Sequence, residues 1–350
     1  MAFLHFSHVR IAGISAAVPR NIINNLTDVE DISNDYSAEE YVKTTGVIER
    51  PISDTLCTSD LCYEAAEKLI ENLNWDKKDI QAIVFVSQTA DYFLPATSCI
   101  LQERLGLSTE CYATDCSLGC SGWVYGLSQV LGLISTGEIK KALLLAGDAK
   151  GHTFGRKDPL FGHAGTATAV EYSEGAPDIQ FHFGTDGSGY DAIITPEGGC
   201  RNPITQDSFK EVIIDGKTYN GLTTRMNGMD VFSFGITTAP KSVKKLAEHF
   251  GFDYLQSDYF VFHQANMKMN DMITKKLKLP LEKVPSCMAH YGNTSSASIP
   301  LTIVTQLKDK LSGTKKFICC GFGVGLSWGT VAFETDNIVV PEVVRVNELN

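Results

Sequence analysis

The chain has 350 residues, 43% of them hydrophobic, and a formal net charge of −11. This length fits one large or two medium-sized globular domains, and the acidic balance argues against nucleic acid as the main partner. No run of eighteen uninterrupted apolar residues is present, and the N-terminal stretch lacks a signal-peptide pattern. We therefore expect a cytoplasmic protein without a membrane partner.

The first half of the chain alternates strand and helix signals. The strand signals are short apolar runs, whereas the helix signals show the 3.6-residue apolar period, with a stop at Asn74 for the first of them. Strands are predicted at 9–19, 81–88, 110–117, 140–149 and 166–173, and helices at 59–74, 96–106 and 120–137.

The second half repeats this alternation and suggests an internal duplication. Helices are predicted at 242–251, 266–278 and 298–311, and strands at 259–265, 315–323 and 326–335. The segments KKALLLAGD (140–148) and KKFICCGFG (315–323) both combine a lysine pair, an apolar strand and a glycine turn. We predict an α/β fold of two similar halves, 1–180 and 181–350, with a site at their interface.

Among the ten cysteines, Cys120 has the sequence surroundings that most favour a catalytic role. Most of the ten cysteines lie in apolar runs without metal-ligand spacing, which predicts reduced, buried thiols and no metal site. Cys120 instead has small residues on both sides and opens an apolar helix, whose N-terminal partial charge would stabilise a thiolate. The alternative is a plain buried cysteine. Cys111 and Cys116 lie in the same segment and have less support.

Two further segments carry polar residues at element ends. His263 follows an apolar strand, where a neutral imidazole can bind a thioester carbonyl or exchange a proton; the alternative is a structural histidine. Asn293 precedes a helix and is either a cap or turn residue or an oxyanion donor. The loop GFGVGLSWG (321–329) lies between two strands and does not fit a phosphate loop. It predicts a tight turn that brings backbone N–H groups near the nucleophile.

These segments together resemble a known family. The motifs TTGVIERPI, ATDCSLGCSGWVYGL, HFGTDGSG, MNGMDVF, FHQANMKM, HYGNTSSASIP and GFGVGLSWG occur in one order along nearly the whole chain. In this order they resemble β-ketoacyl-acyl-carrier-protein synthase III, a condensing enzyme with the thiolase fold. The resemblance implies two duplicated halves stacked in α-β-α-β-α layers.

The resemblance also implies a reaction and its residues. Cys120, His263 and Asn293 would form a catalytic triad, with Cys120 taking an acyl group from a CoA or carrier thioester. His263 and Asn293 would then hold malonyl-acyl-carrier-protein while it loses CO₂ and the carbanion attacks the acyl group. The backbone N–H groups of Cys120 and Gly325 would form an oxyanion hole. No metal or other cofactor is implied, and the family's members are cytoplasmic homodimers.

Acyl carrier protein, the implied partner, is strongly acidic, so an acidic enzyme needs a local basic docking surface. The predicted helix after His263 offers four lysines for this role: Lys268, Lys275, Lys276 and Lys278. The alternative is a solvated helix face.

Several positions depart from the family's pattern around the substrate. Tyr41 stands in place of the tryptophan that stacks on the adenine of CoA, and Met229 in place of a CoA-contacting asparagine. His163 replaces an aspartate, and the loop 151–165 is shortened. We therefore hypothesise an unusual or carrier-delivered primer. The remaining predicted substrate contacts are Gly228, Phe232, Asn266 and Leu94, of which Leu94 would reach across a dimer.

Other classes of protein share parts of this pattern. A cysteine protease also uses Cys, His and Asn, and the spacing 263 − 120 = 143 would suit a papain-like enzyme, but there the nucleophile lies near the mature N-terminus. A relative serving a secondary-metabolite or polysaccharide pathway would share the triad and differ in primer. Acyl transfer to an alcohol or amine, and a non-enzymatic binding module that forms no acyl-enzyme, are the further alternatives.

Overall fold

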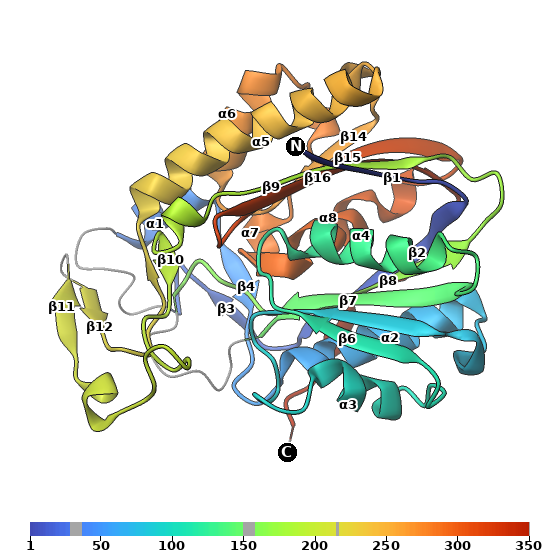
Figure 1. Ribbon diagram of the computed structural model, residues 1–350. Helices are drawn as coiled ribbons and strands as arrows, with labels where there is room; N and C mark the ends of the chain where they lie inside the picture. The colour runs from blue at the N-terminus through green and yellow to red at the C-terminus, as the bar shows by residue number, and fades with distance from the viewer. Residues whose placement is uncertain (29–36, 150–157, 215–216, 350) are drawn as a thin grey trace.

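Two β-sheets lie face to face with a layer of helices between them. The computed structural model describes residues 1–28, 37–149, 158–214 and 217–349 (Figure 1). The first sheet has six strands in the order β17-β2-β8-β7-β5-β6. These strands are β2 (Val9–Pro19), β5 (Ala82–Val86), β6 (Tyr112–Cys116), β7 (Lys141–Asp148), β8 (Ala164–Tyr172) and β17 (Val344–Val346).

The second sheet has five strands in the order β1-β9-β16-β15-β14. Its strands are β1 (Ala2–Phe6), β9 (Ile179–Thr185), β14 (Tyr259–Phe262), β15 (Thr314–Gly323) and β16 (Ser327–Asp336). In the first sheet β5 and β7 are parallel, and β8 and β2 follow in antiparallel pairing. In the second sheet β14 and β15 are parallel, followed by antiparallel β16 and β9. The shared strand order is the duplication that the two lysine-led strands indicated.

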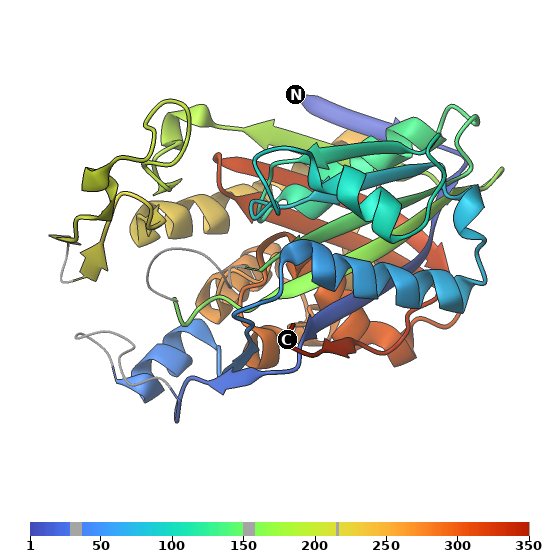
Figure 2. The ribbon, with the colours of Figure 1, turned by 90° about the horizontal axis from the view of Figure 1, so that it is seen from below.

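The helices form three layers around the two sheets, which gives the α-β-α-β-α arrangement (Figure 1). In the middle layer, α4 (Gly122–Ile134) and α8 (Ser298–Leu307) contact strands of both sheets. They are apolar on nearly every side because both of their faces are covered. The outer layers are α2 (Thr58–Leu73) and α3 (Thr97–Arg104) on the first sheet, and α5 (Gly228–Phe250) and α6 (Met267–Leu277) on the second. Figure 2 shows α2 and α3 lying over the first sheet.

Shorter elements surround one end of the layers. The excursion between β9 and α5 contains two short pairs of antiparallel strands, one enclosed within the other in the chain, and α1 lies between the two strands of a third pair. Their bounds are β10 (Ile193–Ile194) with β13 (Arg225–Met226), β11 (Val212–Ile214) with β12 (Lys217–Tyr219), α1 (Ala38–Thr45), and β3 (Ile22–Asn24) with β4 (Glu49–Pro51). The short helix α7 (Met288–Tyr291) leads towards α8.

The observed elements differ from the sequence-based expectations at three points. The helix predicted from residue 242 begins at Gly228 and contains Pro240, a residue that normally ends a helical pattern. Cys120 does not open α4 but lies in the turn two residues before its first residue, Gly122. The predicted boundary at 180–181 falls inside β9. In addition β1 pairs in the second sheet and β17 in the first, so each end of the chain crosses to the other half.

Candidate active site

The turn that carries Cys120 is held by hydrogen bonds within the turn and from the second half of the chain. The Gly122 N–H donates to the Gly119 carbonyl oxygen at 2.7 Å and closes the turn. The buried hydroxyls of Ser121 and Ser327 lie 2.7 Å apart, which ties the turn to the first residue of β16. Cys120 itself is half-buried. The thiol therefore lies where α4 begins and where the two halves meet.

The end of β15 packs directly on this turn because two of its residues, Gly321 and Gly323, have no side chain. A Cβ on Gly321 would lie 2.8 Å from the carbonyl oxygen of Cys120. A Cβ on Gly323 would lie 2.7 Å from the Cys120 Cβ and 3.0 Å from its Sγ. Only glycine permits so close an approach. The paired residues Gly323 and Ser327 close the β15–β16 hairpin, which confirms the predicted turn between two strands.

His263 follows the last residue of β14 and is almost fully buried, with 2% of its surface exposed. Its backbone N–H donates to the Cys320 carbonyl at 2.9 Å, and its Nδ1 lies 2.8 Å from the Ser298 hydroxyl. The ring meets Phe322 edge-on, with the ring centroids 5.7 Å apart. Burial lowers the pKa of His263 to about 3, and a backbone hydrogen bond with Ser295 opposes only part of that shift. The imidazole is therefore neutral at ordinary pH.

Asn293 lies between α7 and α8 and is also buried. Its Oδ1 accepts from the Ser295 N–H at 2.9 Å, and its Nδ2 lies 3.5 Å from the Ala265 carbonyl. Ala265 in turn donates its N–H to the His263 carbonyl at 2.9 Å. These contacts place the amide of Asn293 beside the segment that carries His263.

Ser295 connects the histidine and asparagine segments to the cysteine turn. Its hydroxyl lies 3.2 Å from the position of a Cβ on Gly119, the residue before Cys120. Next to it, Ser296 donates its hydroxyl to the buried Asp148 carboxylate at 3.2 Å. Asp148 also accepts from the Gln88 N–H at 2.9 Å. The segments of Cys120, His263 and Asn293, far apart in the chain, therefore converge between the two sheets.

Two contributors to this site were not singled out from the sequence. Ser298 contacts the His263 ring, and Gly323 rather than Gly325 is the glycine that approaches the thiol. Both lie inside motifs that the sequence displays, GNTSSASIP and GFGVGLSWG, but neither motif reveals which of its residues faces the site. The backbone role of Gly325 stays a prediction.

The neighbouring cysteines are poorer candidates for a nucleophile. Burial raises the pKa of Cys111 to about 11. Burial also raises the pKa of Cys116, although its Sγ accepts a hydrogen bond from Gln129 at 3.5 Å. Both shifts disfavour the reactive thiolate. The preference for Cys120 within this segment is therefore supported by the environments of its neighbours.

The predicted substrate contacts lie on several separate elements. Asn266 caps α6 by accepting from the Met269 N–H at 2.8 Å, and Gly228 is the exposed first residue of α5. Phe232 is half-buried beside the core of the second sheet, and Leu94 is 86% exposed. These roles stay predictions.

The positions that depart from the family's pattern lie outside the site core. The Tyr41 hydroxyl donates to Asp158 at 3.4 Å. Met229 is 78% exposed at the start of α5, and the buried His163 accepts from the Ser53 N–H at 3.2 Å through its Nδ1. Of the shortened loop 151–165, residues 151–157 lie outside the described residues.

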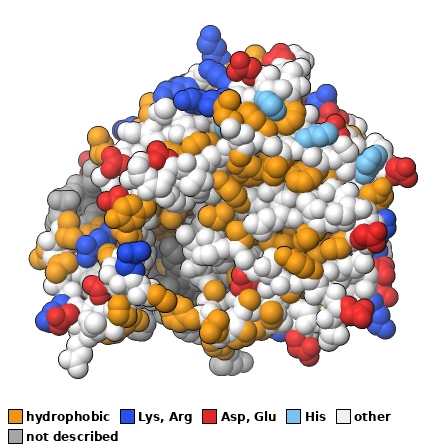
Figure 3. Space-filling view, viewed as in Figure 1, with side chains coloured by type: hydrophobic (Ala, Val, Ile, Leu, Met, Phe, Trp, Pro, Cys, Tyr) orange, Lys and Arg blue, Asp and Glu red, His pale blue; other side chains and the backbone are white. Residues whose placement is uncertain are grey.

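The four predicted docking lysines lie on or directly after α6 and are exposed. The Lys276 Nζ donates to the Ile236 carbonyl of α5 at 3.0 Å. Figure 3 shows Lys and Arg side chains gathered at the top of the molecule, over α5 and α6. The helix α5 itself carries Lys241, Lys244 and Lys245. The lysines therefore belong to a basic surface, defined here as these residues of α5 and α6, on an otherwise acidic chain.

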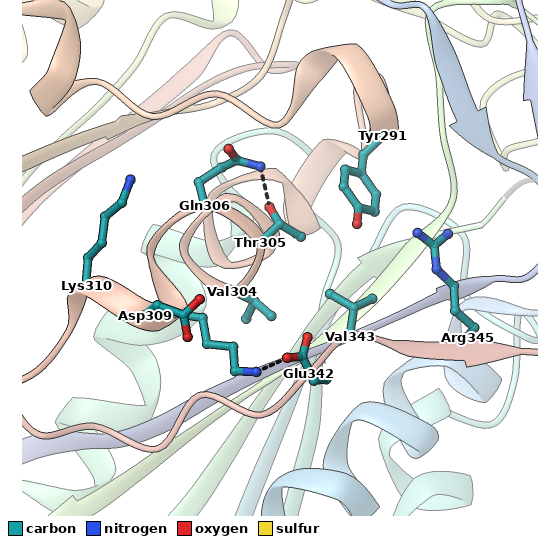
Figure 4. Close-up of a pocket in the computed structure, with 10 residues that line it drawn as sticks. Tyr291, Val304, Thr305, Gln306, Asp309, Lys310, Glu342, Val343 and Arg345 are labelled. Carbon is teal, nitrogen blue, oxygen red and sulfur yellow. Dashed lines mark hydrogen bonds and ion pairs between the residues drawn. The ribbon is translucent and has the colours of Figure 1, made fainter.

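One cavity of about 330 Å³ lies away from these residues, between α8 and the C-terminal segment. In Figure 4 the Tyr291 hydroxyl and the Arg345 guanidinium face the same space, and an ion pair joins Lys308 to Glu342. None of Cys120, His263 and Asn293 lines it. Within the described residues, no group of three or more His, Cys, Asp or Glu side chains could hold a metal ion. No helix in that same part of the chain is long and apolar enough to cross a membrane.

Comparisons with known proteins agree with this geometry. A family model described as 3-oxoacyl-[acyl-carrier-protein] synthase III matches residues 114–187, which include Cys120, and one for its C-terminal part matches 248–335, which include His263 and Asn293. The β-ketoacyl-[acyl-carrier-protein] synthase III of Clostridium acetobutylicum is 33% identical over 334 residues, 93% of this chain and 98% of that protein.

Solved structures show the same likeness. A 3-oxoacyl-(acyl-carrier protein) synthase from Burkholderia xenovorans superposes with a TM-score of 0.90, at 36% identity over 99% of both chains. The priming β-ketosynthase of the R1128 polyketide pathway, at 22% identity and a TM-score of 0.80 over 96% of this chain and 98% of its own, shows the fold alone. The fold and these likenesses define a thiolase-fold condensing enzyme, an acyltransferase. The chain belongs to the 3-oxoacyl-[acyl-carrier-protein] synthase III family.

Proposed function

We propose that this enzyme transfers an acyl group from a thioester to Cys120 and then condenses it with malonyl-acyl-carrier-protein, releasing CO₂ and a β-ketoacyl-carrier. The observation that carries the proposal is the convergence of Cys120, His263 and Asn293 between the two sheets, linked through Gly323 and Ser295. A protease or a plain binding module has no need of this duplicated fold, and family membership favours neither.

In the first step the thiolate of Cys120 attacks the carbonyl carbon of the acyl thioester. The carbon–sulfur bond to the carrier or CoA breaks, and the departing thiolate takes up a proton. Two features support the cysteine as nucleophile. It precedes the N-terminus of α4, where the helix dipole stabilises negative charge, and Gly323 leaves open space beside its Sγ. The N–H groups of Cys120 and Gly325 are proposed to hold the developing oxyanion.

In the second step the malonyl group loses CO₂ and its electrons form an enolate on the thioester. His263 and Asn293 are proposed to donate hydrogen bonds to the enolate oxygen. For His263 this requires a neutral ring protonated on Nε2, so that Nδ1 accepts from the Ser298 hydroxyl. The carbanion then attacks the acyl carbon, the new carbon–carbon bond forms, and Cys120 leaves as a thiolate. No resident cofactor takes part in this proposed sequence.

Acyl carrier protein is the proposed partner, and the basic surface of α5 and α6 its docking site. Lys268, Lys275, Lys276 and Lys278 are exposed, and the helix that carries most of them begins four residues after His263. A carrier docked there can reach the site with its flexible prosthetic arm. Complementary charge on the two surfaces would raise the rate of encounter.

We further propose that the primer arrives on a carrier or has an unusual acyl group. The supporting observations are Tyr41, whose hydroxyl is engaged by Asp158, and the exposed Met229 at the position of a polar CoA contact. A specialised pathway would fit the same chemistry. The test compares steady-state rates with acetyl-CoA and with a panel of carrier-bound acyl groups. Comparable rates with acetyl-CoA and with every carrier-bound primer would contradict the proposal.

We propose a cytoplasmic homodimer. Strand β6 lies at the edge of the first sheet, and an unpaired edge is a ready surface for another strand. Close by in sequence, Phe93 and Leu94 are 93% and 86% exposed, which is unusual for large apolar side chains in a free monomer. Sedimentation of the wild type and of Leu94→Asp tests this. A monomeric wild type at micromolar concentration would refute the dimer.

The reaction as a whole is tested by measuring CO₂ release and β-ketoacyl product with malonyl-carrier after acylation by a panel of thioesters. We expect both products from the wild type. Cys120→Ala should lose the condensation product. His263→Ala and Asn293→Ala should lose CO₂ release while still becoming acylated. Absence of any β-ketoacyl product across the panel would reject the proposed reaction.

A further inference from the structure

A buried arginine contacts the segment that pairs with the backbone of Asn293. Arg50, in β4, is only 3% exposed. Its Nε donates to the Asn25 Oδ1 at 3.1 Å, and its Nη1 donates to the Phe161 carbonyl oxygen at 3.0 Å. Burial lowers the pKa of Arg50, an effect that the nearby Tyr41 and Asp158 oppose. Burying a cation is costly unless hydrogen bonds or opposite charges compensate it, so the contacts of Arg50 are important for its environment.

Asn25 adds a second hydrogen bond to the segment that Arg50 contacts, residues 159–161. It is fully buried, and its Nδ2 donates to the carbonyl oxygens of Val47 at 3.1 Å and Pro159 at 2.9 Å. Arg50 and Asn25 therefore hold two carbonyl groups two residues apart, at positions 159 and 161. A segment held at both points has little freedom to shift sideways.

The held segment pairs with Asn293 on both of its backbone groups. The Asn293 N–H donates to the Leu160 carbonyl at 2.9 Å, and the Gly162 N–H donates to the Asn293 carbonyl at 3.1 Å. Packing is tight here, since a Cβ on Gly162 would clash with the Tyr291 carbonyl oxygen. Residues 160–162 therefore fix the position of the Asn293 backbone.

We propose that Arg50, together with Asn25, is a positioning residue for Asn293 and so controls the decarboxylation step. The inference rests on the proposed function, because it assigns Arg50 to the step in which Asn293 binds the malonyl thioester. In the contacts described, Arg50 meets Asn25 and Phe161 rather than the cysteine turn. Cys120 is held by other contacts, those of Ser121 and Gly323. Acylation of Cys120 is therefore independent of Arg50, and condensation is not.

The same segment also reaches the predicted substrate entrance. Asp158 accepts from the Tyr41 hydroxyl at 3.4 Å and, through the same Oδ1, from the Leu160 N–H at 2.9 Å. One carboxylate thus joins a predicted substrate contact to the residue that pairs with Asn293. Its charge also lies near the buried guanidinium. The positioning unit is continuous from Tyr41 to Asn293.

The test is Arg50→Lys in the full-length enzyme, which keeps the positive charge but cannot span both acceptors. Arg20→Lys is the matched control. Arg20 also donates to a side-chain amide oxygen, that of Asn347 at 2.7 Å, and to a backbone carbonyl, that of Arg345 at 3.3 Å. Its acceptors lie in the C-terminal segment and not in residues 159–162. The readouts are the rate of Cys120 acylation by intact mass and the rate of CO₂ release from malonyl-carrier.

For Arg50→Lys we expect CO₂ release to fall about 10- to 100-fold, the size of effect that a misplaced catalytic group produces, with acylation within about twofold of wild type. Arg20→Lys should leave both rates unchanged. Equal losses in acylation and CO₂ release by Arg50→Lys would overturn the proposal, because they indicate a general structural role. So would unchanged CO₂ release.

If Arg50→Lys does not fold, Asn25→Ser carries the test, since it keeps Arg50 and removes the link to Pro159. The same selective loss is expected, and equal loss or no loss overturns the proposal. A wild type that acylates but releases no CO₂ would instead reject the proposed function, which separates the two failures.

Discussion

The neutral state of His263 gives a prediction that can be worked through in numbers. Burial lowers its pKa from 6.5 to about 3, which corresponds to roughly 5 kcal/mol in favour of the uncharged ring. At pH 5.5 an ordinary imidazole would be about 90% charged, whereas His263 would be charged in fewer than about 1% of molecules. CO₂ release that depends on a neutral His263 should therefore not change between pH 8 and pH 5.5 on account of this group.

The assay is CO₂ release from malonyl-carrier by Cys120→Ala, because this variant removes the thiol whose own titration would complicate the profile. We expect a flat profile through pH 6.5. A roughly tenfold fall in CO₂ release between pH 8 and pH 5.5, centred near pH 6.5, would show that the ring titrates normally and would refute the reasoning.

The same shift predicts an acid sensitivity of folding. The pKa of His263 is lower in the folded state than in the unfolded state, so below about pH 6.5 the unfolded protein takes up a proton that the folded protein does not. The free energy of unfolding is therefore highest above about pH 6.5 and falls as the pH is lowered towards 3. From pH 7 to pH 5.5 the free energy of unfolding should fall by about 1.3 kcal/mol more in the wild type than in His263→Gln. Equal falls in the two proteins, measured by urea unfolding, would contradict a buried neutral histidine.

Three further substitutions test other contacts of the site. Gly323→Ala places a Cβ 3.0 Å from the Cys120 Sγ, so acylation should slow by about 10-fold or more while the fold survives; an unchanged acylation rate would show that the close approach of residue 323 to the thiol is not needed. Ser298→Ala removes the partner of the His263 Nδ1, and CO₂ release should fall about 5- to 10-fold at unchanged acylation. Lys275→Glu should raise the KM for malonyl-carrier about 3- to 10-fold, less so in high salt, with no change for a malonyl-pantetheine thioester. Lys78→Glu, an exposed lysine of the other half, is its control, and equal effects of the two would argue against a docking site.

Much of the fold follows from local sequence patterns. The 3.6-residue period of α2 and its stop at Asn74 are confirmed, since Asn74 adopts the left-handed conformation that ends the helix. The start of α5 could not be foreseen, because it depends on tertiary packing. Gly235 lies against Phe322 and Met269 so closely that a Cβ would lie 2.5 Å from the Met269 Sδ, and Pro240 is buried in the helix interior. Packing outweighs the local preference of both residues against a helix.

The sequence predicted the candidate catalytic residues of the site, but not the residues that hold them in position. Cys120, His263 and Asn293 each lie in a segment with a recognisable pattern, and the resemblance of the whole chain brought them together. The burial of Arg50 had no sequence signal, because a charged residue in a three-residue strand is usually solvated. Its role depends on Asn25 and Phe161, and contacts between residues so far apart in the chain exist only after folding.

The central claim is that Cys120 carries the acyl group. Intact mass spectrometry after incubation with acyl-carrier and acyl-CoA thioesters tests it directly, with Cys116→Ala as the matched control in the same segment. We predict one acyl adduct on the wild type and on Cys116→Ala, its discharge on addition of malonyl-carrier, and no adduct on Cys120→Ala. An adduct that persists on Cys120→Ala would contradict the account.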